Sequence, residues 1–398
     1  SDALSRKQYV KPPLIPRLAP LHFQFANYLQ YFDWQWARTL EGTQTLFSFL
    51  RLPFTLLFTT LGIYGALEHF KRDRASWWYV VTLFATLSAA LVFYLNFKYG
   101  YSIADPVGGN PELHEVRERD YFFIVSFSVW GLWAGMGIAA LWKAIAKRER
   151  WSYRKAAPIL LLALLPLILN WSWASRAGDY SARDWAYNLL MSVEPYGVLF
   201  TNGDNDTFPL WYLQEVEGIR RDVTVIVTSY LNIDWYALQL RDLTAPCEEG
   251  EDPGMDRTRI ICQRAYLPEG SPGAEYVTPD LAQSVEARGK VPLLVDEPIT
   301  APTRSILPLE DEQIARVAVT VAPIEEDRTL DLGQGVSARL RGQTLVYPWH
   351  QFALSIISFS LGDRPVYFAS SGNAADELGL TPFLIRQGVA YRLNPGLP

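Results

Sequence analysis

Long runs without charge dominate the first 175 residues of the chain. Three of them contain no Asp, Glu, Lys or Arg: Ala75–Phe97, Tyr121–Trp142 and Ala156–Ser175. A fourth run, Thr43–Leu67, is interrupted only by Arg51. Each run is close to the ~20 residues with which a helix crosses the hydrocarbon core of a bilayer. Trp and Tyr residues stand near the ends of the runs, as in the aromatic belts of membrane proteins.

We therefore predict four transmembrane helices within residues 43–175, preceded by an N-terminal arm of residues 1–42. Arg51 lies about two turns inside its run, where its long side chain can extend to the lipid headgroups. The alternative is a large soluble core with four buried helices, but such helices have no need of aromatic residues at their ends.

A different pattern follows residue 175, in which helical and β-branched segments alternate. The segments that we expect to be helices are Ser181–Val193, a helix capped by Thr207, Asp234–Leu243 and Trp349–Leu361. The segments that we expect to be strands are Gly197–Thr201, Val223–Thr228, Pro365–Ala369 and Val389–Leu393. This alternation predicts an α/β domain with a mainly parallel sheet over residues 176–398. Residues 245–345 form an irregular insertion rich in Pro, Gly, Asp and Glu, with short strands expected at Val291–Val295 and Arg316–Val321.

Charge is distributed unevenly between these two parts. Residues 1–175 carry 18 Lys and Arg against 11 Asp and Glu, a balance of +7, and residues 176–398 carry 18 against 31, a balance of −13, which sum to the net −6. The absence of an overall basic excess argues against a nucleic-acid partner. The loops 68–74 and 143–155 hold nine basic residues and the opposite side of the membrane holds six, so the positive-inside rule places those two loops in the cytoplasm. We thus expect a multi-pass protein of the inner membrane whose α/β domain is periplasmic.

The two cysteines of the chain, Cys247 and Cys262, both fall in the acidic part. In an oxidising compartment they can form a disulfide, worth ~3 kcal/mol on the loop-entropy model. Two free thiols remain the alternative.

The densest group of candidate ligands is Asn202-Gly-Asp-Asn-Asp206, which contains Asn202, Asp204, Asn205 and Asp206. It stands between a predicted strand and a predicted helix, where α/β sheets bind ligands. Its two carboxylates could hold a divalent cation or bind sugar hydroxyls. The alternative is that these residues serve only the turn and the helix cap, which their propensities also explain.

A second group, His114-Glu-Val-Arg-Glu-Arg-Asp120, directly precedes the third apolar run. Arg117 and Arg119 could recognise an anionic lipid headgroup, and His114 and Glu115 could join a metal or acid–base site. The alternative is a solvated helix entrance stabilised by its own i,i+3 and i,i+4 ion pairs.

Both groups resemble the DUF2723 family of bacterial membrane proteins, which is similar to a TMEM-type animal protein O-mannosyltransferase. The resemblance is carried by five stretches: Arg6–Tyr9, Pro12–Leu14, His114–Phe123, Trp130–Gly137 and Leu199–Gly218. It runs through most of residues 6–240 and more weakly to Pro365–Ala369. It implies a GT-C-like glycosyltransferase that uses a lipid-linked sugar.

In such enzymes the catalytic acid lies in the first extracytoplasmic loop. We expect this chain to begin downstream of that loop, either inside a longer gene product or at a processing site. Asp33 is the one carboxylate deep in the N-terminal arm, and its sequence context does not make it a base. No catalytic residue is carried over, so two functions remain. The chain is either the non-catalytic C-terminal part of a membrane glycosyltransferase or an accessory subunit of a larger membrane complex, such as a respiratory or photosynthetic one. Its expected partners are membrane lipids and, in the second case, other subunits.

Overall fold

The computed structural model describes residues 14–40, 48–103, 110–150, 152–251, 261–266 and 300–397. The chain separates into two compact units, Ser1–Ala177 (unit 1) and Gly178–Pro398 (unit 2). The resemblance stretch Arg6–Tyr9 and the expected strand Val291–Val295 lie outside the described residues.

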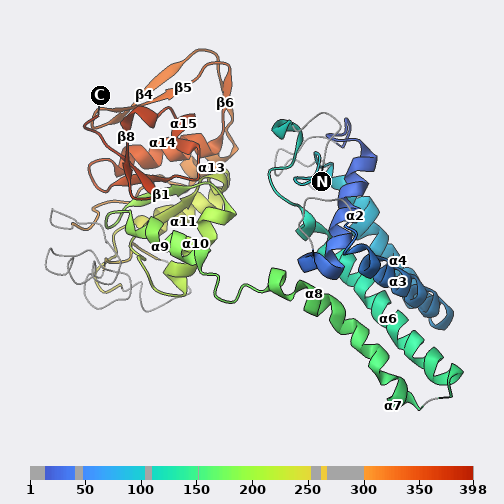
Figure 1. The fold of residues 1–398 in the computed structure, drawn as a ribbon. Coiled ribbons are helices and arrows are strands. Elements are labelled where there is room, and N and C mark those ends of the chain that lie inside the picture. The colour runs from blue at the N-terminus through green and yellow to red at the C-terminus, as the bar shows by residue number, and fades with distance from the viewer. Residues whose placement is uncertain are drawn as a thin grey trace. The chain divides into compact units, whose positions relative to one another are not determined.

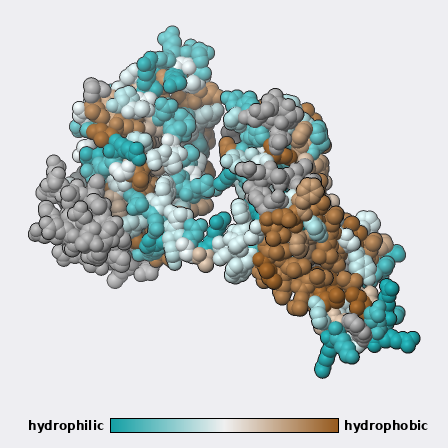
Figure 2. Space-filling model, in the orientation of Figure 1, coloured by the Kyte–Doolittle hydropathy of each residue, from teal (hydrophilic) through white to brown (hydrophobic). Residues whose placement is uncertain are grey.

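Unit 1 is helical (Figure 1). Its α-helices are α2 (Leu21–Ala37), α3 (Leu52–Arg72), α4 (Arg74–Ala85), α5 (Leu91–Leu95), α6 (Ile124–Arg148), α7 (Tyr153–Ala156) and α8 (Leu165–Ala174). A π-helical turn joins α4 to α5, and a 3₁₀ segment joins α7 to α8. Among the described residues, three continuous helical stretches are long and apolar enough to cross a membrane: Arg74–Leu95, Asp120–Arg148 and Tyr153–Ala174. These correspond to three of the four predicted spans, and Figure 2 shows the apolar surface of this region.

The fourth predicted span differs from the expectation. Residues 43–47 lie outside the described part, and α3 begins at Leu52 and continues to Arg72. Its last turn carries His69, Lys71 and Arg72, so the helix runs on into charged residues. The expected position of Arg51 was wrong, because its side chain is fully buried and its Nε lies 2.7 Å from Oδ2 of Asp33 instead of reaching toward the headgroups.

Glycines allow α3 and α6 to pack closely. A Cβ placed on Gly65 would lie 1.8 Å from the carbonyl oxygen of Trp133, and one on Gly137 would lie 2.0 Å from that of Leu61. Small residues bring membrane helices together in this way. Gly131, also on α6, faces open space among the described residues, since a Cβ there would meet nothing within 4 Å.

Gly65→Ala is therefore expected to destabilise unit 1 by about 1–3 kcal/mol, because the two backbones must move apart to admit the methyl group. Gly131→Ala is the matched control and should lose no stability, since alanine is the better helix former. Thermal unfolding of the two variants in detergent measures the difference. Equal melting temperatures would contradict the close packing.

Unit 2 is built on a five-stranded mixed sheet with the strand order β2-β1-β7-β9-β8. The strands are β1 (Val198–Thr201), β2 (Thr224–Val227), β7 (Val366–Ala369), β8 (Leu384–Gln387) and β9 (Ala390–Leu393). β1 pairs in parallel with β2 and with β7, whereas β9 is antiparallel to both β7 and β8. The expected mainly parallel sheet is thus a mixed sheet with a parallel centre.

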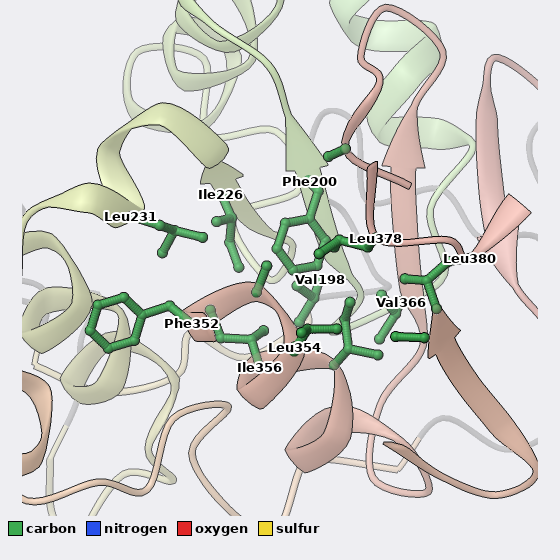
Figure 3. Close-up of a cluster of buried hydrophobic side chains, with 14 of the residues drawn as sticks. Val198, Phe200, Ile226, Leu231, Phe352, Leu354, Ile356, Val366, Leu378 and Leu380 are labelled. Atoms are coloured by element: carbon green, nitrogen blue, oxygen red, sulfur yellow. The ribbon is translucent and has the colours of Figure 1, made fainter. Parts of the chain in front are cut away.

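Helices cover both faces of this sheet. They are α9 (Ser181–Met191), α10 (Asp204–Glu215), α11 (Asp234–Thr244), α13 (Asp311–Val319), α14 (Pro348–Ser360) and the short α15 (Ala374–Glu377). Alternate strand residues point to opposite faces. Leu199 packs in the cluster with α9 and α10, and Val198 and Phe200 pack in the cluster with α14. Figure 3 shows this second cluster, in which Phe352 and Ile356 of α14 lie beneath the strand residues.

Two local expectations in unit 2 were wrong. Residues Arg316–Val321 were expected to form a strand, but α13 extends to Val319. The backbone N–H of Glu310 donates to Oε1 of Gln313 at 2.9 Å, which caps the helix, and Ile314, Val317 and Ala318 contact the core at helical spacing.

The other concerns Thr207, which is not the N-cap of α10. The helix begins at Asp204 after Gly203, and Thr207 is buried inside it.

The described part of the insertion also contains two small antiparallel sheets. One pairs β3 (Ala322–Ile324) with β6 (Thr344–Val346), and the other pairs β4 (Arg328–Gly333) with β5 (Val336–Leu340). Their buried residues, among them Val336 and Ala338, join the core beneath α14. This part of the insertion is therefore packed against the α/β core.

Candidate functional site

The central strands β1 and β7 are parallel neighbours whose connections leave in opposite directions. The chain passes from β1 through α10 to β2 on one side, and from β7 to β8 and β9 on the other. In open α/β sheets, ligands bind outside the carboxyl ends of the strands at such a switch point. The predicted segment Asn202–Asp206 follows β1, and Ser370–Asn373 follows β7, so both stand at this position.

Asp206 links the two segments. Its carboxylate accepts hydrogen bonds from the backbone N–H groups of Asn202 and Gly203, both at 2.8 Å, and from the hydroxyl of Ser371 at 2.7 Å. The side chain is 5% exposed. Asp206 is the N3 residue of α10 and accepts from the backbone N–H of the N-cap Gly203, which explains why the helix begins earlier than Thr207. Its contacts are those of a structural residue.

The other three candidate residues of this segment, Asn202, Asp204 and Asn205, are exposed. Asp206 is buried and bound by its three donors, whereas these three residues lie at the surface. Among the described residues, no group of three or more His, Cys, Asp or Glu side chains is arranged to hold a metal ion. The geometry offers an open polar edge rather than an enclosed site.

Sequence reasoning missed Ser371. The Ser370-Ser-Gly-Asn373 segment follows a buried strand and has the same turn-forming composition as the segment after β1. That signal was present in the sequence. The hydrogen bond between Ser371 and Asp206 could not be predicted from the sequence, because 165 positions separate the two residues.

Asp206→Ala is expected to lower the free energy of unfolding by about 1–2 kcal/mol, because two backbone N–H groups and the Ser371 hydroxyl lose their acceptor. Asp204→Ala, an exposed position in the same turn, should change it little. Chemical denaturation of both variants makes the comparison. Equal losses would show that Asp206 does not join the two segments.

The second predicted group, residues 114–120, packs against α2 in unit 1. Nδ1 of His114 lies 2.9 Å from the carbonyl oxygen of Gly100. Glu115 accepts from the backbone N–H of Lys98 at 3.0 Å and pairs with Arg119 at 2.9 Å. Arg117 is exposed and lies over the ring of Tyr121, with its guanidinium carbon 5.6 Å from the ring centre.

The remaining carboxylates of this segment also have partners. The hydroxyl of Tyr31 donates to Glu118 at 2.8 Å, and Asp120 lies 3.3 Å from Arg38. Burial lowers the pKa of Arg119, but its hydrogen bonds to Tyr121 and Glu115 outweigh this effect and hold the pKa above its usual value. Of the four candidates, Glu115 and Arg119 are brought together as an ion pair, and His114 and Glu115 bind the segment Lys98–Gly100. The link to α2 is made by Tyr31, which contacts Glu118 and the backbone N–H of Arg119.

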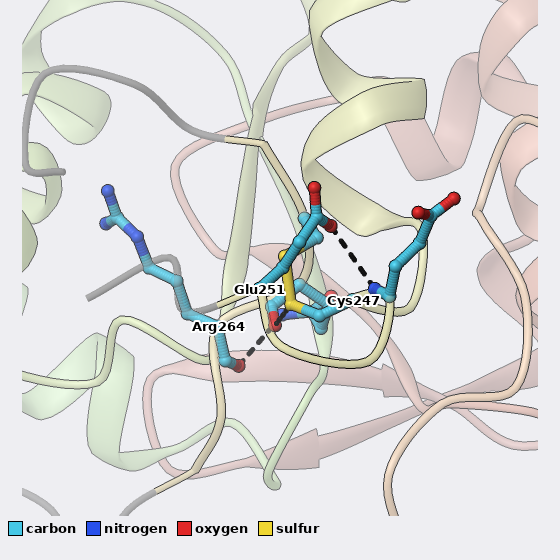
Figure 4. Close-up of a disulfide and its surroundings, with 6 residues drawn as sticks. Cys247, Glu251 and Arg264 are labelled. Carbon is cyan, nitrogen blue, oxygen red and sulfur yellow. Dashed lines mark hydrogen bonds between the residues drawn. A yellow bond between two sulfur atoms is a disulfide. The ribbon is translucent and has the colours of Figure 1, made fainter. Parts of the chain in front are cut away.

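Cys247 and Cys262 form a disulfide (Figure 4). It joins the residues just after α11 to the segment Cys262–Tyr266, in which the backbone N–H of Gln263 donates to the carbonyl of Ala245 at 2.8 Å. This anchored segment contributes Arg264, which pairs with Glu215 of α10.

Comparison with known families gives one match. The model of TMEM260-associated domain 2 matches residues 182–249, which contain α9, β1, α10, β2 and α11. No curated protein and no solved structure matches the chain. The match covers the parallel β1–β2 unit and the Asn202–Asp206 segment. Residues 182–249 are thus similar to a TMEM260-associated domain, and the apolar helices of unit 1 indicate a membrane protein.

Proposed function

We propose that this chain is a DUF2723-like protein of the inner membrane that has no transferase activity by itself and presents a binding domain, unit 2, on the periplasmic side. The observation that carries this proposal is that the buried carboxylates already accept hydrogen bonds from the protein. Of the described Asp and Glu residues, Asp33, Asp206 and Asp222 are buried. Each already accepts hydrogen bonds within the protein. A general base needs a lone pair aimed at a substrate proton, whereas these three carboxylates are buried and bind groups of the protein itself.

The proposed orientation, with four spans, rests on the basic loops. Lys71 and Arg72 lie in the last turn of α3, and Lys147 and Arg148 lie in the last turn of α6. This clustering at helix ends supports a cytoplasmic position for both loops. The disulfide between Cys247 and Cys262 supports an oxidising, periplasmic position for unit 2.

The accessory-subunit function is the second candidate, and the exposed apolar surface of the spans is compatible with it. Within Arg74–Leu95 and Tyr153–Ala174, only 11% and 6% of the most apolar window is buried inside the structure. These helices therefore present most of their apolar surface to lipids or to the helices of other subunits.

The test is a glycosyl-transfer assay of the purified full chain with polyprenyl-phosphate-linked sugars, together with affinity purification from native membranes in mild detergent. We expect no transfer above a heat-denatured control. Transfer that Asp204→Asn or Asp206→Asn abolishes would overturn the proposal. Recovery of other subunits in fixed stoichiometry would favour the accessory function, and recovery of lipids alone would favour a binding domain.

A further inference from the structure

The turn between α6 and α7 is strongly basic. Residues 143–155 contain six Lys and Arg residues against a single carboxylate, Glu149, a balance of +5. Glu149 lies 3.7 Å from Arg148, but both side chains are more than half exposed, so water screens this pair and it neutralises the cluster little. We call the six residues the basic hairpin, and all of them are exposed: Lys143, Lys147, Arg148, Arg150, Arg154 and Lys155.

A tertiary contact closes the hairpin. Nε1 of Trp142, in α6, donates to the carbonyl oxygen of Tyr153, the first residue of α7, at 2.9 Å. The two rings are also in contact, with centres 5.4 Å apart. This contact holds the end of α6 beside the start of α7 (Figure 1). The basic residues of both helices therefore form one cluster.

The basic hairpin lies where two candidate spans meet. The stretches Asp120–Arg148 and Tyr153–Ala174 are both long and apolar enough to cross a membrane. The turn that joins them must then lie at a membrane surface, on whichever side of the bilayer. Figure 2 shows polar side chains at this end of unit 1, next to its apolar surface. Clusters of Lys and Arg directly beside a span attract anionic lipid headgroups.

An apolar surface follows the hairpin along the chain. Leu160, Leu161 and Leu164 are 38%, 61% and 45% exposed. They belong to the 3₁₀ segment Ala157–Leu164, and Leu161 stands roughly 10 Å further along the helix axis than Lys155, since such a helix rises ~2 Å per residue. A ligand that contacts both surfaces has an anionic head and hydrocarbon tails. Free phosphate would use the basic surface alone.

The other loop that we place on the same side of the membrane has a much smaller surplus of charge. Residues 68–74 carry three basic residues against Glu68 and Asp73, a balance of +1. Glu68 lies 2.9 Å from Lys71 and 3.6 Å from Arg72. This loop therefore offers a matched control, with three basic residues whose charge is largely balanced.

We propose that the basic hairpin binds an anionic phospholipid, with the lipid headgroup at the cations of α6 and α7 and the acyl chains along the exposed leucines that follow. The site does not depend on the proposed function, because it involves neither unit 2 nor the orientation of the spans.

The test uses the full chain in mild detergent and native mass spectrometry with two lipids of identical acyl chains, phosphatidylglycerol and phosphatidylcholine. We expect the anionic lipid to bind about tenfold more tightly, because several cations act on its net negative charge. An equimolar amount of inorganic phosphate should not displace it, because phosphate has no acyl chains. Equal affinities for the two lipids, or displacement by inorganic phosphate, would overturn the proposal.

Variants locate the site. The triple variant Lys147→Gln/Arg148→Gln/Arg150→Gln should bind the two lipids almost equally. The control Lys71→Gln/Arg72→Gln/Arg74→Gln, which removes the same charge from the other loop, should keep the preference. If both variants lose it equally, the total charge of the protein determines lipid binding and the basic hairpin is not the site.

Glu149→Gln provides a gain of binding that loss of folding cannot imitate. It removes the one carboxylate among residues 143–155, and the side chain is 53% exposed, so water can replace its contact with Arg148. The change should tighten phosphatidylglycerol binding several-fold and leave phosphatidylcholine binding unchanged. Unchanged or weaker phosphatidylglycerol binding by a folded Glu149→Gln protein would contradict a headgroup site at these cations.

Discussion

Replacing Asp222 with alanine is expected to destabilise unit 2 by about 3–5 kcal/mol, because the change leaves the guanidinium group of Arg220 buried without its carboxylate. Asp222 accepts from Nε and Nη2 of Arg220, both at 2.9 Å, and from the backbone N–H of Tyr196 at 3.0 Å. The two side chains are 0% and 2% exposed. Nη1 of Arg220 donates in turn to the carbonyls of Leu190 and Val193. The pair thus joins the end of α9 to the start of β2.

Hydrogen exchange read by mass spectrometry measures this effect within unit 2. The amides of β1 and β2 should lose protection in Asp222→Ala. The control is Arg392→Ala, which removes a 3.0 Å ion pair with Glu194 whose arginine is 40% exposed. That loss should cost at most about 1 kcal/mol. Similar losses in the two variants would show that burial does not determine the contribution of the Arg220–Asp222 pair.

The elements that the sequence predicted well are those that local pattern defines. The uncharged runs at Ala75–Phe97, Tyr121–Trp142 and Ala156–Ser175 are long enough to exclude a strand, and helices occupy all three. In unit 2, the β-branched run Val223–Thr228 contains β2, because a short apolar segment between turn residues is typical of a buried strand.

Elements that depend on distant partners were not predicted. β8 has the residues Leu-Ile-Arg-Gln and no strong β pattern, and it forms as one arm of a hairpin with β9, which itself pairs with β7, roughly 20 residues earlier in the chain. The segment Arg316–Val321 was expected to form a strand because it contains β-branched residues. Most of it belongs to α13 instead, because the apolar side of this helix packs on the core. Tertiary contacts override propensity in such short segments.

In the candidate site, too, local sequence predicted some features and others depend on tertiary contacts. Turn composition correctly indicated a change of direction after β1, and the switch-point position follows from strand order, which the sequence does not state. The contact between Asp206 and Ser371 arises from packing between segments far apart in the chain. Arg51 illustrates the limit most clearly, since hydropathy alone favours a headgroup position and only the fold supplies Asp33.

Asp33→Ala is expected to have a comparably large effect on unit 1, with a loss of about 3–5 kcal/mol. Asp33 of α2 accepts from Nε of Arg51 at 2.7 Å and from the hydroxyl of Thr55 at 2.5 Å. Asp33 and Arg51 are 0% exposed. Removing the carboxylate leaves a charged group in an apolar interior without this partner and also breaks the link from α2 to α3. Asp33→Asn keeps an acceptor for Thr55, so its loss should be smaller.

Thermal unfolding in detergent, followed by tryptophan fluorescence, checks this order, since Trp34 and Trp36 lie on α2 beside the pair. Glu68→Ala, which removes the exposed 2.9 Å pair with Lys71 on α3, is the control and should leave the melting temperature nearly unchanged. The expected order of melting temperatures is wild type and Glu68→Ala highest, then Asp33→Asn, then Asp33→Ala. If Asp33→Ala melts at the same temperature as Glu68→Ala, the buried pair does not hold α2 against α3. Arg51 would then have to be stabilised by other contacts.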